Sequence, residues 1–465
     1  MANILLVEPN YRSKFPPLGL MRISTFHKGQ GDAVTFVRGT DPAMRSVSWD
    51  RIYVSSLFTF ELPRTVRTIK YYRTSVNSDK DIYVGGIAAT LKPDYIRNYV
   101  DCSLIVGPLD KPGMLGGDMK PVASLVPDYD ILRMVNYRYE PEDTYFCRIT
   151  VGCIRNCAYC AVPTLEPVYG LGSSIHQQIE EVRTRFGEKQ HLVLMDNNFL
   201  AIEGLVDIIE QIKDEGFAAG ATRNKKRRTV DFNQGLDARL VTPEVAKILS
   251  GINLSPVRFA FDYDAMEGPY RRAITLMADA GFREFTSYVM FNFSDDPFSF
   301  YRRLRVNLEL SQELGVLVTG FPMRYIPISD DNRRHIGKHW NWRFLRGIQC
   351  VLLATHGVVS PNPAFFEAAF GRTYDEFREI LAMPDLYIIY RNRYREQADE
   401  WRRAYRQLSD EERNDFLVLL ERLNGRDLKT KRQMMLAAGS KYRDLLWHYY
   451  PEVFDPTIVQ ETLNV

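Results

Sequence analysis

Three cysteines lie close together about a third of the way along the chain. They stand in the segment Thr150-Val-Gly-Cys153-Ile-Arg-Asn-Cys157-Ala-Tyr-Cys160, which has a C-x3-C-x2-C spacing. Thiolates are soft ligands that bind iron–sulfur clusters and zinc. Three thiolates can hold three irons of a cubane cluster and leave the fourth iron open, as inner-sphere chemistry requires. The spacing therefore predicts a [4Fe–4S] cluster bound by Cys153, Cys157 and Cys160.

A zinc site is the alternative that this cysteine group leaves open. Four of the six cysteines fall between positions 147 and 160, and Cys147 is available as a fourth thiol. Strand alternation does not tell whether Cys147 faces the other three. Zinc sites usually combine a C-x2-C pair with a second pair further along, so the observed spacing favours the cluster.

The motif resembles the signature of the radical SAM superfamily, including the aromatic Tyr159 directly before the third cysteine. The resemblance implies that the open iron chelates the amino and carboxylate groups of S-adenosylmethionine (SAM). One electron, from a reductant such as flavodoxin or ferredoxin, then breaks the S–C5′ bond. In that family the resulting 5′-deoxyadenosyl radical abstracts hydrogen from a substrate. Neither the substrate nor a catalytic residue follows from the resemblance.

The elements around the motif are those of an α/β fold. Residues 140–335 alternate β-rich and helical patterns, which predicts an incomplete barrel with its function at the carboxyl ends of the strands. This agrees with the partial (β/α)6 core that the resemblance implies. The remainder, 340–465, has helical periodicity and is expected to form a helical C-terminal region. The expected strands are Thr144–Thr150, His191–Asn197, Thr229–Asn233, Arg258–Asp262, Phe285–Phe293 and Val316–Ile326.

Polar residues at the ends of these strands are the candidates for holding SAM. They are Asp196 and Asn198 after the second strand, Gln234, Asp237 and Arg239 after the third, and Asn292 after the fifth. The resemblance implies that the first pair lies near the SAM amino group, although a helix N-cap would also explain them. The second set suits ribose hydroxyls or the SAM carboxylate, since arginine pairs with carboxylates through a planar fork. A plain salt bridge is the alternative there.

The first 130 residues predict a separate α/β domain, a doubly wound parallel sheet with helices on both faces. Apolar β runs at 3–9, 51–58, 81–88 and 102–108 are separated by helical patterns at 18–28 and 61–74. The domain resembles the cobalamin (B12)-binding-like domain that precedes the barrel in one class of radical SAM enzymes. The resemblance is carried by Phe15-Pro-Pro-Leu-Gly-Leu20 and Val84-Gly-Gly-Ile-Ala88.

Whether cobalamin binds is left open by the sequence. The D-x-H-x-x-G motif that supplies a lower axial histidine is absent, and His27 lies in a helical pattern instead of a loop. Some members of the class bind cobalamin without this histidine. Gly85 and Gly86 would allow a flat ligand to approach the backbone closely. The alternative is a degenerate domain that shapes the substrate pocket.

Composition excludes little beyond the extremes. The chain has 465 residues, 45% of them hydrophobic and 25% charged, with a net charge of +2. This is the balance of a soluble globular protein of two or three domains, and the oligomeric state does not follow from it. No segment has the apolar length of a membrane span and the first residues do not form a signal peptide. We therefore expect a cytoplasmic protein, where clustered thiols stay reduced.

These features leave three hypotheses for function. The first is a radical SAM enzyme that acts on an unidentified substrate by hydrogen abstraction. The second is a cobalamin-dependent radical SAM methyltransferase. The third, of another class, is a non-catalytic iron–sulfur or zinc protein that binds nucleic acid through the basic run Arg223-Asn-Lys-Lys-Arg-Arg228. A solvated loop is the ordinary explanation of such a run.

Overall fold

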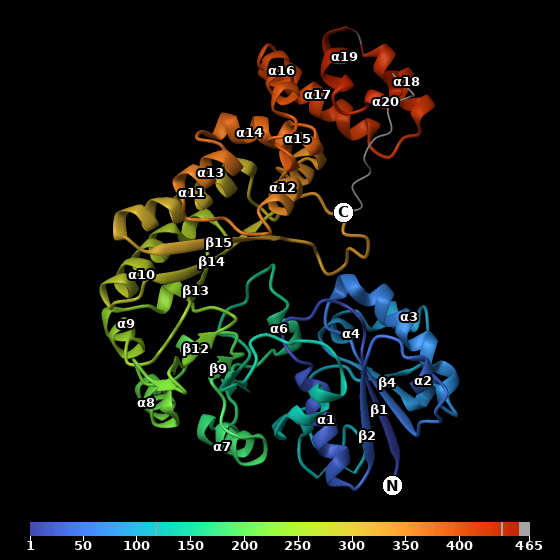
Figure 1. The fold of residues 1–465 in the computed structure, drawn as a ribbon, viewed down its shortest axis with the longest axis vertical. Coiled ribbons are helices and arrows are strands. Elements are labelled where there is room, and N and C mark those ends of the chain that lie inside the picture. Colours follow the sequence, from blue (N-terminus) through green and yellow to red (C-terminus); the bar gives the residue numbers. More distant parts are fainter. Residues whose placement is uncertain (118, 439, 455–465) are drawn as a thin grey trace. The chain divides into compact units, whose positions relative to one another are not determined.

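The structure of the chain is a computed structural model that describes residues 1–117, 119–438 and 440–454 (Figure 1). It contains two compact units, each of which is described by itself. The first comprises residues 1–258 with 279–282 and 327–334. The second comprises 259–278, 283–326 and the described residues from 335 onward.

The first unit begins with a five-stranded sheet in the order β2-β1-β3-β4-β5. Its pairs are parallel, and β1 lies between β2 and β3. The strands are β1 (Asn3–Glu8), β2 (Ala33–Arg38), β3 (Arg51–Ser55), β4 (Ile82–Gly85) and β5 (Ser103–Leu104). The sequence prediction found four of them and overlooked β2. As an edge strand, β2 is fully buried only at Phe36 and Val37, so it lacks the continuous apolar run of a central strand.

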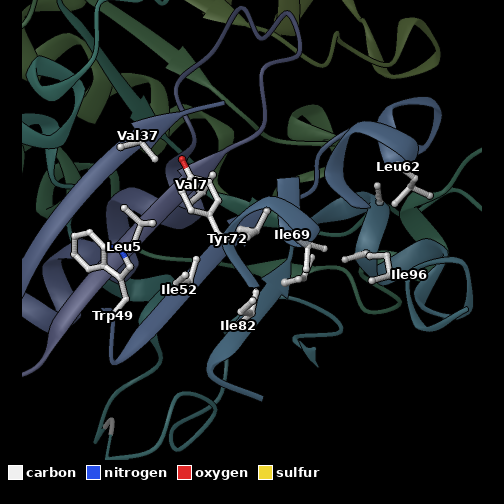
Figure 2. Close-up of a cluster of buried hydrophobic side chains, with 14 residues drawn as sticks. Leu5, Val7, Val37, Trp49, Ile52, Leu62, Ile69, Tyr72, Ile82 and Ile96 are labelled. Carbon is white, nitrogen blue, oxygen red and sulfur yellow. The ribbon is translucent and has the colours of Figure 1, made fainter. Parts of the chain in front are cut away.

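Helices cover both faces of this sheet, as its side-chain alternation requires. Leu5 and Val7 of β1 lie in a core with α3, α4 and α5 (Figure 2). Ile4 and Leu6 lie in a second core with α1. Each fully buried aliphatic side chain contributes about 1.5–3 kcal/mol to folding. The helices of this part are α1 (Leu18–Gly29), α2 (Pro42–Arg45), α3 (Leu62–Tyr72), α4 (Ile87–Leu91) and α5 (Pro93–Arg97).

The rest of the first unit is built on a second parallel sheet, of order β12-β9-β6. Its strands are β6 (Thr144–Cys147), β9 (His191–Leu194) and β12 (Thr229–Phe232), and they are the first three expected barrel strands. Because they run parallel, their carboxyl ends meet at one edge. The helices between and after them are α6 (Val162–Leu165), α7 (Ile175–Phe186), α8 (Leu205–Ile212) and α9 (Pro243–Leu249).

The second unit contains the remaining strands of the expected barrel and the helical C-terminal region. A three-stranded sheet has the order β13-β14-β15, and its first strand spans the boundary between the units. The strands are β13 (Val257–Ala260), β14 (Glu284–Phe291) and β15 (Leu317–Arg324), with α10 (Glu267–Asp279) and α11 (Pro297–Leu314). The helices that follow are α12 (Trp342–Ala354), α13 (Pro363–Phe370), α14 (Tyr374–Ala382), α15 (Asp385–Ile389), α16 (Arg395–Arg406), α17 (Asp410–Leu423), α18 (Leu428–Ala437), α19 (Ser440–Trp447) and α20 (Pro451–Phe454). Across the described residues, every helix is too short or too polar to cross a bilayer.

Candidate functional site

The three motif cysteines lie on a loop between two very short strands. The strand β7 (Thr150–Val151) pairs antiparallel with β8 (Gly170–Leu171), and the loop that joins them carries all three thiols and α6. Cys160 is exposed, and Cys153 and Cys157 are half-buried. The loop follows β6, so it belongs to the carboxyl edge of the β12-β9-β6 sheet. The strand-then-loop placement expected from the sequence is confirmed.

Cys147 is set apart from these thiols by its burial. It ends β6, is 1% exposed, and burial raises the pKa of its thiol above the usual range. Within the described residues, no group of three or more His, Cys, Asp or Glu side chains is placed to hold a metal ion, so the structure gives no support to Cys147 as a fourth ligand for zinc.

Gly152 makes the sharp turn into the cysteine loop. Its φ is +71°, and a Cβ at this position would stand 2.4 Å from the carbonyl oxygen of Val168. Only glycine fits both conditions, because other residues pay for a positive φ and no contact this close is tolerated. A glycine is thus required directly before the first motif cysteine, because the returning end of the loop, at Val168, packs against it.

Two carboxylates, the buried Asp196 and the half-buried Glu166, hold the start of the loop in place. Asp196, just after β9, accepts hydrogen bonds at Oδ1 from the Ile149 backbone N–H at 3.0 Å and the Thr150 hydroxyl at 2.7 Å. Glu166 accepts the Gly152 backbone N–H at 2.9 Å and forms an ion pair with Arg148. These contacts link the loop to the carboxyl edge of the sheet and order the backbone before Cys153.

The two carboxyl groups differ in their proton affinity. Burial raises the pKa of Asp196, and its hydrogen bonds only partly oppose that rise. Burial also acts on Glu166, but there the Arg148 guanidinium, the Gly152 N–H and the Asn197 amide outweigh it and lower the pKa. Glu166 is therefore the firmly charged member of the pair.

Asn198 and Asp237 reach the cysteine loop from the neighbouring strand ends. The Asn198 amide donates to Cys153 Sγ at 3.4 Å and to Asp237 Oδ2 at 3.5 Å. Asp237 also accepts the Arg155 Nε–H at 2.9 Å, and Arg155 lies between the first two motif cysteines. The structure thus brings Asn198 and Asp237 to the cysteine loop through contacts with the protein itself.

Asp237 and Arg239 form the salt bridge that was the alternative explanation of this pair. Arg239 Nε donates to Asp237 Oδ1 at 2.7 Å. Burial raises the pKa of Asp237, but the hydrogen bonds from Arg239 and Arg155 outweigh burial and hold the pKa below its usual value. Gln234 is exposed at the same strand end. A contact of these residues with SAM stays a prediction.

Asn292 performs a structural task within the second unit. It is fully buried with a φ of +71°. Its amide donates to the carbonyl of Tyr325 at 2.9 Å and to that of His335 at 3.2 Å, and its oxygen accepts the Gly337 N–H at 2.8 Å. Both ends of the side chain are thus used by loops after β14 and β15, and its predicted cofactor contact stays untested.

Two buried oxygen atoms at the end of β9 have no hydrogen-bond partner in the protein. They are Asp196 Oδ2 and Asn198 Oδ1, on side chains that are 2% and 3% exposed. Leaving a buried acceptor unsatisfied costs about 1–3 kcal/mol, so such atoms in a site indicate a missing donor. A ligand with N–H or O–H groups would satisfy them.

The donor set of the loop fits an iron–sulfur cluster. The Arg155 backbone N–H points to Cys153 Sγ at 3.3 Å and the Val162 backbone N–H to Cys160 Sγ at 3.5 Å, as suits thiolate ligands. Within the described parts of the chain, no three His, Cys, Asp or Glu side chains converge on a point that would hold a single metal ion. A cubane spreads its three thiolates over three different irons, so it does not require such convergence.

Several residues of this site were missed by the sequence analysis. Arg155 occupies a variable position of the motif, and Glu166 lies six residues beyond its last cysteine. Their partners, Asp237 and Arg148, are 82 and 18 residues away along the chain. The aromatic and glycine residues beside the cysteines are visible in the sequence as part of the motif. Ion pairs between residues far apart in the chain leave no such local pattern in the sequence.

In the N-terminal sheet, the edge where a ligand would bind is the carboxyl edge between β1 and β3, where the strand order reverses. Tyr11 Oη and Ser55 Oγ meet across it at 3.1 Å. The Gly86 Cα faces the chain itself, since a Cβ there would stand 2.6 Å from the Ser56 carbonyl oxygen. The close approach expected at Gly86 is therefore made by the Ser56 backbone.

His27 lies in α1, as its sequence pattern indicated. It is 2% exposed and contacts Asp32 Oδ2 at 2.8 Å and Tyr53 Oη at 2.9 Å. Burial lowers the pKa of its imidazole. Both ring nitrogens are thus used inside the domain, and the helical position predicted for His27 is confirmed.

The basic run 223–228 forms a β-hairpin instead of an irregular loop. Its strands are β10 (Thr222–Arg223) and β11 (Lys226–Arg227), joined by Asn224 and Lys225 with positive φ. Arg223 pairs with Asp143 at 3.0 Å, and the buried Arg228 pairs with Glu188 at 2.6 Å. Two of its cations are therefore engaged in ion pairs with acidic side chains.

Comparison with known proteins identifies the class of the fold. No family model matches the sequence, and no curated protein does either. Among solved structures, the fold of the chain is similar to that of a radical S-adenosylmethionine methyltransferase. The fold class expected from the sequence is thus confirmed.

One of the matching structures is that of the radical S-adenosylmethionine methyltransferase TsrM from Kitasatospora setae, determined with cobalamin and a [4Fe–4S] cluster bound. It is 14% identical, with a TM-score of 0.50, over 70% of this chain and 75% of that one. The cobalamin-dependent S-adenosylmethionine radical enzyme OxsB, in its apo form, matches with a TM-score of 0.42 at 14% identity, over 72% and 54%.

Proposed function

We propose that the chain is a radical SAM enzyme that binds a [4Fe–4S] cluster through Cys153, Cys157 and Cys160 and reductively cleaves SAM to act on an unidentified substrate. The observation that carries the proposal is the C-x3-C-x2-C loop at the carboxyl edge of a parallel sheet, in a fold shared with a radical SAM methyltransferase. When bound, the cluster supplies an open iron and one electron. The electron donor would be a flavodoxin- or ferredoxin-type reductant in the cytoplasm.

The unpartnered oxygens at the end of β9 support a place for SAM. Asp196 Oδ2 and Asn198 Oδ1 lack donors, and the SAM ammonium group carries three. An ammonium beside Asp196 would also favour the ionised carboxylate, against the effect of burial. In this proposal Asp196 and Asn198 orient the amino end of SAM, while Gln234 and Arg239 are candidates for its ribose and carboxylate.

The test is anaerobic reconstitution followed by reduction with dithionite in the presence of SAM. We expect about four irons per chain, a brown protein, and formation of 5′-deoxyadenosine. Cys157→Ala should abolish both the cluster and the product. Cys102→Ala, which alters a half-buried cysteine of the N-terminal domain, is the matched control and should retain both. A fully reconstituted protein that never cleaves SAM contradicts the proposal.

A cobalamin-dependent methyltransferase is the second candidate, and one observation favours it. The N-terminal sheet order β2-β1-β3-β4-β5 places a ligand-binding edge between β1 and β3, and the matching TsrM structure contains cobalamin. This reaction predicts cobalamin retained on purification and two SAM consumed per turnover, one of them yielding S-adenosylhomocysteine. If the purified protein retains no cobalamin and forms 5′-deoxyadenosine but no S-adenosylhomocysteine, the methyltransferase proposal fails. The radical SAM enzyme without cobalamin then remains.

The non-catalytic nucleic-acid-binding hypothesis has less support. Arg223 and Arg228 of the hairpin are held by Asp143 and Glu188, which neutralise them locally. Lys225, Lys226 and Arg227 remain exposed. A salt-dependent affinity for RNA or DNA in a protein that does not cleave SAM would restore this hypothesis.

A further inference from the structure

The sulfur of Cys153 receives two N–H donors from separate segments of the chain. One is the backbone N–H of Arg155, at 3.3 Å, within the cysteine loop. The other is the side-chain amide of Asn198, at 3.4 Å, from the loop after β9. Both distances suit sulfur, which is a larger and more diffuse acceptor than oxygen.

One carboxylate contacts the side chains of both residues that supply these donors. Asp237 Oδ2 accepts the Arg155 Nε–H at 2.9 Å and lies 3.5 Å from the Asn198 amide nitrogen. Its other oxygen is held by Arg239 at 2.7 Å, and its side chain is only 5% exposed. The carboxylate is therefore fixed in place, and through Arg155 and Asn198 it orients two N–H groups at one sulfur.

We propose that Asn198 and Asp237 are positioning residues that set the reduction potential of the cluster through Cys153. The inference rests on the proposed function, because it requires the cluster on these cysteines. Reduction by dithionite adds one electron to the [4Fe–4S]²⁺ cluster and gives the 1+ state, with no bond made or broken. N–H groups that point at a cysteine sulfur stabilise the added negative charge, so they raise the potential.

Burial makes this effect larger than it would be in water. Asn198 is 3% exposed, so solvent does not replace its amide if the contact is lost. Electrostatic interactions are stronger in such a low-dielectric setting. If Asn198 had a purely structural role, its replacement would change the yield of folded protein but not the reduction potential of the cluster.

The variant that tests the inference is Asn198→Leu, which has a similar size and no N–H. We expect its cluster to have a more negative midpoint potential than that of the wild-type holoenzyme, in a titration followed by EPR. Asp237→Asn also removes a negative charge close to the cluster, which by itself raises the potential, so Asn198→Leu, which keeps every charge, is the variant that decides. The matched control is Asn197→Leu, because the Asn197 amide donates to Glu166 at 2.9 Å. The midpoint potential of the cluster in this control should equal that of the wild type.

A spectroscopic measurement on the unaltered sequence keeps the inference testable even if Asn198→Leu fails to assemble. In protein labelled with ¹⁵N in the asparagine side-chain amides, pulsed EPR should detect a coupling between ¹⁵N and the reduced cluster. Absence of that coupling, or an unchanged potential in Asn198→Leu with a complete cluster, overturns the inference and leaves the proposed function intact. Failure of the wild-type chain to bind any cluster instead contradicts the proposed function.

Discussion

At the scale of single residues, the cysteine motif depends on neighbours that do not themselves bind metal. Gly152 turns the backbone, Asp196 and Glu166 anchor it, and Asn198 contacts the first sulfur. A loop of three thiols is soft by itself, since it has little secondary structure. Its geometry is therefore set by a few hydrogen bonds to the edge of the sheet.

Gly152→Ala tests how strictly the backbone is held. The new Cβ would stand 2.4 Å from the Val168 carbonyl oxygen at a φ of +71°. A forced positive φ alone costs about 1–3 kcal/mol, and the clash adds to it. We expect a lower unfolding free energy of the apoprotein in urea and less iron bound after reconstitution.

Gly170→Ala is the control for this change, because it lies on the partner strand β8 with no atom within 4 Å of the added Cβ. It should behave like the wild type in both measurements. If Gly152→Ala binds iron as well as this control does, the strict turn is not required.

The hairpin cations allow a second residue-scale prediction. Arg228 is 7% exposed, pairs with Glu188 and lies over the Phe217 ring at 3.8 Å. Its replacement by Ala should lower the unfolding free energy by about 2 kcal/mol, because it removes the packing on Phe217 and breaks an ion pair with a half-buried carboxylate. Lys226→Ala, at an exposed position of the same hairpin, should change it by less than about 0.5 kcal/mol.

Urea unfolding of both variants measures these effects. Equal stabilities would show that Arg228 belongs to the solvated surface. In that case the whole run would again be a candidate for binding phosphates.

At the scale of elements, α1 is tied to the N-terminal sheet by a buried polar contact. His27 joins Tyr53 of β3 to Asp32, the residue before β2. The contact explains why the one histidine of this domain lies in a helix facing the sheet. It also keeps His27 away from the opposite edge of the sheet, which is the candidate ligand edge.

The buried His27 gives the domain a pH dependence of stability. Burial lowers its pKa in the folded state below the ordinary value of 6.5. The unfolded chain therefore takes up a proton first as the pH falls, and the unfolding free energy drops between pH 6.5 and the lower folded pKa. His27→Gln, which does not titrate, should lack this part of the dependence.

The measurement is the unfolding free energy of both proteins between about pH 7.5 and 5, a range that spans the ordinary pKa of histidine. The difference between wild type and variant should shrink as the pH falls. A difference that stays constant would mean that His27 has the same pKa in the folded and unfolded states.

At the scale of the whole molecule, the first unit contains two candidate ligand edges. One is the β1/β3 edge of the N-terminal sheet, and the other is the carboxyl edge of the β12-β9-β6 sheet. The two sheets are built from separate segments of the chain. Their ligands should therefore bind through different residues and stabilise the protein separately.

This separation can be measured by ligand-dependent thermal unfolding. A ligand that binds only the folded state adds about 2.7 kcal/mol at a concentration one hundred times its Kd. Hydroxocobalamin should raise the Tm of both the wild-type protein and Cys157→Ala. SAM should raise the Tm of the reconstituted wild type and have little effect on Cys157→Ala.

If hydroxocobalamin leaves the Tm of both proteins unchanged, the cobalamin proposal fails and the radical SAM proposal stands. If Cys157→Ala loses the cobalamin effect as well, the two sites are not independent. The Tm measurements therefore show whether ligand binding at the N-terminal domain depends on the cysteine loop.

Part of this protein could be predicted from its sequence because some signals are local. The cysteine spacing, the apolar runs of the central strands and the helical pattern around His27 each depend on residues close together in the chain. The edge strand β2 was missed, since four of its six residues are at least partly exposed and its periodicity is weak. The tertiary structure alone paired Asp237 with Arg155, placed the Asn198 amide at Cys153 and buried Cys147. Those contacts join strand ends that are dozens of residues apart, and they form only when parallel strands bring their carboxyl ends to one edge.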